Sequence, residues 1–231
     1  MVDFRIDLTK AKAAPNYLYF IRLLRALNDL LSVMQSIQAV EESSSLPNEF
    51  KKHLKTYLLS IQHGHLVEAC KAFVYNIEKN PTHSNAVRTW IQARPPLYGT
   101  FSELRSMLDD PLYTSLRNYR DSLVFHYDSD NQSKQTEDAF TKQVSLWEQF
   151  SKQGPSNLNL IVVGDEPHQQ RFLLADHLSW MHWGDQLGLA GSRTKTQAII
   201  HFQAQLYGRF SDFANAAFIA WCEENELFLS T

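Results

Sequence analysis

The feature that most constrains the fold is a regular stripe of apolar residues near the start of the chain. Its members recur in alternating steps of three and four residues, which places them on one face of an α-helix: Tyr17, Phe20, Leu24, Leu27, Leu31 and Met34. Pro15 precedes the stripe, where the beginning of a helix accepts proline. The stripe must be buried, and its length of about three heptads favours packing within a helical bundle over a free-standing coiled coil.

Further helices are predicted along most of the chain. Their limits follow from prolines, glycines and polar runs. The first are expected at about 47–80, with a break at Gly64, and at about 84–93. A short helix follows from a Thr100/Glu103 capping box, and another starts at Asp110 and Pro111. The last four are expected at about 140–150, 167–187, 194–207 and 212–227, and the final two are capped by Thr194 and Ser211. Residues 158–164 are the one strand-like run and are interpreted as an extended connector or an edge strand that pairs across a dimer.

The expected fold is therefore an all-α helical bundle with additional C-terminal helices and at most one short extended segment. We expect a single domain over residues 1–231, with the bundle core at about 15–153 and a C-terminal helical extension at about 158–231. No internal repeat or convincing interdomain linker interrupts it.

Composition and charge exclude several classes of protein. With 44% hydrophobic and 20% charged residues the chain is typical of a soluble globular protein. Its net charge of -3 argues against a general nucleic-acid coat or a membrane-surface protein, so any RNA contact must be local. Cys70 and Cys222 form no disulfide framework, the first residues show no signal peptide, and no apolar run approaches the roughly 20 residues of a membrane span. We therefore expect a cytoplasmic protein with no membrane partner.

The usual cofactor and metal motifs are absent from the sequence. There is no Walker loop, dinucleotide-binding glycine motif, zinc-protease histidine pair, serine-hydrolase elbow or paired Cys-x-x-Cys, so no cofactor and no metal are expected. Two groups of residues contain possible metal ligands but have no recognised ligand spacing: His63 with His65, and Asp176 and His177 with His182 and Asp185. For both groups, histidines in a loop or in half-buried positions are the favoured interpretation. Trp180, Trp183 and Trp221 could stack on bases, but an aromatic core is favoured.

Candidate chemistry lies within residues 116–128. The helix starting at Asp110 and Pro111 is predicted to carry one apolar stripe: Leu112, Leu116, Tyr119, Leu123 and Tyr127. Arg120 and His126 are six residues apart and fall roughly 60° to either side of this stripe. They are therefore expected at the edge of the packed face, where a cleft can form.

This stretch resembles the Arg-x(4-6)-His signature of the HEPN superfamily, and in particular its bacterial abortive-infection branch. The residue after the arginine in that superfamily is commonly Asn, Asp or His, and here it is Asp121. The resemblance implies a late helix of an α-bundle, a homodimer that pairs two motifs across a cleft, and metal-independent endoribonuclease activity. Other members are inactive binding modules. The branch with a modified tyrosine has His-x-Tyr, whereas Tyr127 directly follows His126, so we do not expect that modification.

The expected roles follow from side-chain chemistry. His126 would move a proton between the RNA 2′-hydroxyl or leaving oxygen and solvent, because an imidazole with a pKa near 6.5 acts in either direction near neutral pH. Arg120 would hold the scissile phosphate and stabilise the pentacovalent transition state. Asp121 is expected to orient Arg117 or a group of the partner chain, and Tyr127 to form a cleft wall.

Other interpretations remain open at the level of sequence. Arg171 and His177 share the spacing but lack the flanking residues, so they are the weaker pair. The Arg120/His126 pair can also be structural. A non-catalytic helical module that binds a nucleotide or a regulatory partner is the main alternative, and a host-defence toxin with a separately encoded antitoxin is a third. The expected partners are a second copy of the chain, single-stranded RNA or a nucleotide, and a cognate antitoxin.

Overall fold

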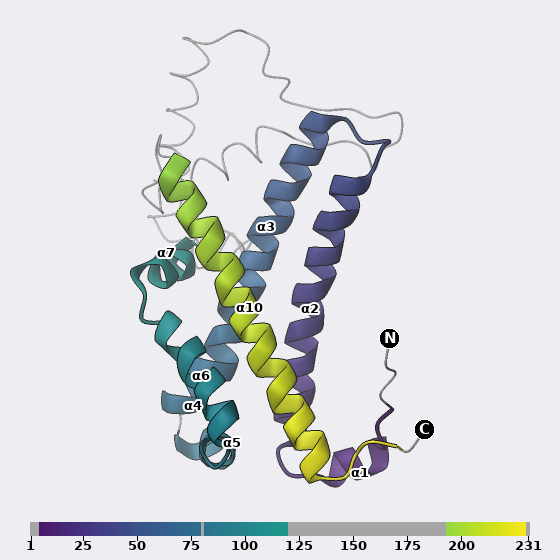
Figure 1. Cartoon of the computed structure of the whole chain (residues 1–231), viewed down its shortest axis with the longest axis vertical. Helices are drawn as coiled ribbons and strands as arrows, with labels where there is room; N and C mark the ends of the chain where they lie inside the picture. The colour runs from purple at the N-terminus through teal and green to yellow at the C-terminus, as the bar shows by residue number, and fades with distance from the viewer. Residues whose placement is uncertain (1–4, 80, 120–192, 230–231) are drawn as a thin grey trace, which may run out of the picture. The chain divides into compact units, whose positions relative to one another are not determined.

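The computed structural model describes residues 5–79, 81–119 and 193–229, and these residues are almost entirely helical (Figure 1). The elements in chain order are α1 (Leu8–Ala13), α2 (Tyr17–Glu42), α3 (Asn48–Cys70), the π-helical turn η1 (Lys71–Tyr75), α4 (Asn76–Lys79), α5 (Pro81–Gln92), α6 (Pro95–Met107), α7 (Pro111–Tyr119) and α10 (Arg193–Glu224). The all-α prediction is confirmed, since β pairing in these residues is limited to one antiparallel bridge between Ile6 and Phe228.

Several expectations fall outside the described residues. These are the strand-like run at 158–164, the helices at about 140–150 and 167–187, and the boundary between bundle core and extension near 153. Among the helices that are described, none has the length and apolar character needed to cross a membrane.

Helix α2 begins and ends where the sequence predicts, but its buried face differs from the expected stripe. The side chains that it buries are Phe20, Leu23, Leu27, Leu30 and Val40. Leu31 and Met34, which belong to the expected stripe, are 38% and 39% exposed. Leucines occur here in adjacent pairs, so two stripes with the same spacing overlap and periodicity alone does not choose between them.

Gly64, predicted to break a helix, and Gly208, in the predicted gap between two helices, both lie inside helices. Helix α3 continues through Gly64 to Cys70, and the 32-residue α10 continues through Gly208 where two separate helices were expected. Glycine inside a helix costs about 1 kcal/mol relative to alanine. Helix α10 buries apolar residues on both sides of Gly208, and α3 buries Leu66, Val67 and Cys70 directly after Gly64. Burial of even one large apolar side chain contributes about 1.5–3 kcal/mol. Packing therefore outweighs the local preference.

Two helix starts also differ from the sequence interpretation. Helix α6 begins at Pro95, five residues before the expected capping box, because proline fits the first turn of a helix. Thr100 is internal to it, and its hydroxyl donates to the carbonyl of Leu97 at 2.9 Å. Helix α1 was not expected; the Asp7 carboxylate caps it by accepting from the backbone N–H of Thr9 at 2.9 Å.

The structure divides into two compact units. The first comprises Met1–Ser32, His65–Tyr113 and His201–Thr231. Its core is centred on Trp221, which is 1% exposed and stacks on Phe20 with ring centroids 4.7 Å apart. The indole N–H of Trp221 donates to the carbonyl of Pro15 at 2.7 Å, which satisfies its one polar atom. The interpretation of Trp221 as an aromatic core residue is thus confirmed.

Helix α10 ends within this unit in a Schellman motif. The N–H of Leu227 donates to the carbonyl of Cys222 at 2.9 Å, and the N–H of Glu226 donates to that of Glu223 at 3.2 Å. Glu226 adopts the left-handed conformation, with φ 51°. The segment after α10 then runs back beside α1 (Figure 1), where the N–H of Asp7 donates to the carbonyl of Leu227 at 2.9 Å.

The second unit comprises Val33–Gly64 and Thr114–Ile200. Its described residues include the end of α2 and most of α3, joined by a short polar connection. The ammonium of Lys55 forms an ion pair with the Glu41 carboxylate across this connection. The hydrogen bond from Lys55, and then its charge, hold the pKa of Glu41 below its ordinary value.

Candidate functional site

Of the five residues predicted to form the site, Arg117 alone lies in the part of the chain that the structure describes. It is exposed, near the end of α7. The other four are Arg120, Asp121, His126 and Tyr127, and they lie outside the described residues, as do Arg171, His177, Trp180 and Trp183. The pairing of Arg120 with His126 remains a prediction.

The helix that leads into these residues begins as the sequence predicts. Pro111 is the first residue of α7, and the Asp110 carboxylate accepts from the N–H of Leu112 at 2.7 Å as its N-cap. Leu116 is fully buried, as expected, but Tyr113 is buried beside it whereas Leu112 is only half-buried. The buried face is therefore turned slightly from the predicted stripe.

A buried histidine anchors α7 within the second unit. His63 of α3 is 1% exposed, and its Nε2 lies 2.9 Å from the backbone oxygen of Leu116. A carbonyl only accepts, so Nε2 must carry a proton and donate. The sequence favoured a loop or half-buried position for His63, which is wrong, because α3 is continuous there. The hydrogen bond joins residues 53 positions apart, so no local sequence pattern predicts it.

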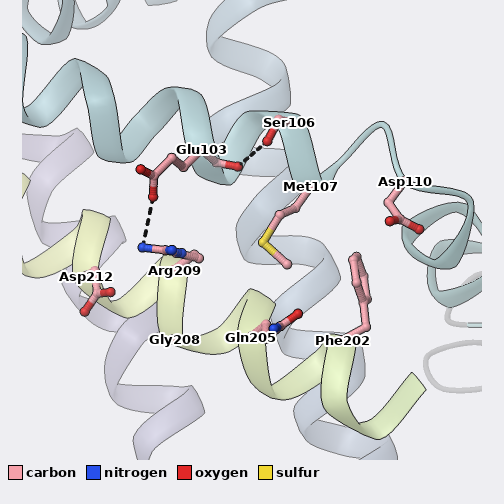
Figure 2. Close-up of a pocket in the computed structure, with 9 residues that line it drawn as sticks. All are labelled: Glu103, Ser106, Met107, Asp110, Phe202, Gln205, Gly208, Arg209 and Asp212. Atoms are coloured by element: carbon pink, nitrogen blue, oxygen red, sulfur yellow. Dashed lines mark hydrogen bonds and ion pairs between the residues drawn. The ribbon is translucent and has the colours of Figure 1, made fainter. Parts of the chain in front are cut away.

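A groove of about 500 Å³ lies between α6 and α10, within the first unit (Figure 2). It was not expected from the sequence. One side is lined by Glu103, Ser106 and Met107 of α6 and by Asp110, which follows α6. The other side is lined by Phe202, Gln205, Gly208, Arg209 and Asp212 of α10. The α10 residues recur at steps of three, three, one and three, so they share one face of that helix. A volume of this size is typical of small-molecule sites.

The groove carries more negative than positive charge. Its one guanidinium, that of Arg209, pairs with the Glu103 carboxylate at 2.9 Å. Asp110 and Asp212 lie on opposite sides of Figure 2, with the Glu103–Arg209 ion pair, Gln205 and Met107 between them. Neither aspartate pairs with a cation in the part of the chain that is described. The groove therefore has an aspartate toward each end and a middle that mixes polar and apolar side chains.

Both cysteine thiols are buried. Cys70 and Cys222 are free thiols with no exposed surface. Burial raises the pKa of Cys70, and burial together with Glu223 raises that of Cys222 to about 11, so neither forms a reactive thiolate near neutral pH. Burial also raises the pKa of Tyr19, whose hydroxyl donates to the carbonyl of Phe73 at 3.3 Å. These groups support the core.

A metal centre is not formed by the described side chains. Within residues 5–79, 81–119 and 193–229, no three histidine, cysteine or carboxylate side chains come together as ligands. His65, the partner of His63 in the proposed ligand pair, is only half-buried, and His63 is engaged with Leu116.

Comparison with known proteins adds no relative to these observations. No protein-family model, no curated protein and no solved structure matches the chain. The function must therefore be inferred from the residues and contacts of the chain itself.

Proposed function

We propose that this protein is a metal-independent endoribonuclease of the HEPN type, with Arg120 and His126 as its catalytic residues. The observation that carries the proposal is the sequence Arg120–Asp121 followed by His126–Tyr127, directly after the helix that Asp110 caps. The all-α architecture is compatible with the proposal. So is the anchoring of α7 by His63, because a catalytic constellation must be held on a rigid element.

The proposed reaction is a transfer of the phosphoryl group within the RNA strand. His126 accepts the proton of the 2′-hydroxyl, whose oxygen attacks the adjacent phosphorus and displaces the 5′-oxygen. The leaving oxygen takes up a proton, so the products are a 2′,3′-cyclic phosphate and a 5′-hydroxyl. Arg120 stabilises the additional negative charge on the phosphoryl oxygens, the role for which a permanently charged planar guanidinium is suited.

A second copy of the chain completes the proposed site. One motif supplies a single arginine and a single histidine, and a homodimer with the two motifs facing each other provides both an acid and a base at one phosphate. Asp121 orients Arg117 or a group of the partner chain, and Tyr127 forms the cleft wall. Positive charge for RNA is local to this region, because the chain as a whole carries a net charge of -3 and the groove beside α10 is acidic.

In a cell, an unregulated ribonuclease of this kind would arrest growth. We therefore propose a role as a cytoplasmic toxin or phage-defence effector that is held inactive by a cognate antitoxin. The alternative is a non-catalytic module that binds a nucleotide or partner in the same cleft, and the experiment below separates the two.

The test is cleavage of single-stranded RNA by the purified chain in excess EDTA. Arg120→Ala and His126→Ala should each lower the rate by about 10²- to 10⁴-fold while circular dichroism stays unchanged. Arg171→Ala and His177→Ala are the matched controls and should retain full activity. Products should carry 2′,3′-cyclic phosphate ends, and light scattering should give a dimer. If the controls lose activity instead, the wrong pair has been chosen. If the wild type binds RNA without cleaving it, with or without divalent metal, the binding module is correct.

A further inference from the structure

We draw no further inference here: the strongest candidate, the open groove between α6 and α10, is lined by exposed and half-buried carboxylates, and nothing else in the described part of the chain points to a ligand there.

Discussion

The conformation of Glu226 provides a stringent test of how α10 ends. Its φ of 51° lies in the left-handed region, which costs an L-residue other than asparagine or aspartate about 1–2 kcal/mol. Glycine removes this cost but gains freedom in the unfolded chain worth about 0.5–1 kcal/mol. Glu226→Gly is therefore expected to stabilise the protein by about 0.5–1 kcal/mol. For a chain of this size that corresponds to a rise in Tm of about 1–4 °C.

The matched control is Glu223→Gly, three residues earlier and within the last turn of α10. Glu223 is exposed and has helical geometry, so the same substitution there should destabilise the protein by up to about 1 kcal/mol. Glu226→Ala controls for the lost carboxylate and should change stability little. Urea and thermal unfolding, followed by circular dichroism, measure all three variants. If both glycine variants lower Tm equally, Glu226 is not left-handed and the Schellman ending of α10 is incorrect.

Two further predictions concern buried polar groups. His63→Leu should lower the free energy of unfolding by about 1–3 kcal/mol, because the Leu116 carbonyl loses its donor. The amide of His63→Gln can still donate, so this variant should lose less stability in urea titrations. Equal losses in the two variants would show that the hydrogen bond does not stabilise the protein. With a pKa of about 11, only about one in 1,000 Cys222 thiols ionises at pH 8, so native Cys70 and Cys222 should react with iodoacetamide at least a hundredfold more slowly than in urea. Rapid labelling of the native protein at pH 8 would contradict the buried positions of the two thiols. Folding raises both thiol pKa values, so the folded protein binds more protons than the unfolded one. Its stability should therefore fall as pH rises above the ordinary thiol pKa of 9.0.

The helices could be predicted from the sequence because the signals that start and end them are local. Pro15, the polar run after Glu42 and the Asp110–Pro111 cap mark real helix limits. The same local signals misjudged Gly64 and Gly208, since a glycine costs less than the surrounding burial contributes.

The groove and the His63–Leu116 hydrogen bond could not be predicted from the sequence, because both depend on residues far apart in the chain. The groove brings Asp110 of one segment beside residues of α10 that lie about a hundred positions later, and neither segment carries a motif on its own. The bond from His63 to Leu116 likewise depends on packing rather than on spacing. The pattern around Arg120 could be found because six residues on one helix are a local relation.

The bond between Trp221 and Pro15 has a consequence for synthesis. It joins residues 206 positions apart, and at about 5–20 residues per second a ribosome needs about 10–40 s to proceed from one to the other. During that interval Phe20 has emerged without its stacking partner, so the apolar face of α2 is available to chaperones and to neighbouring nascent chains. The first unit can acquire its core only once α10 has left the exit tunnel. Translation that stalls ahead of Trp221 leaves a chain that proteases can clear before it folds.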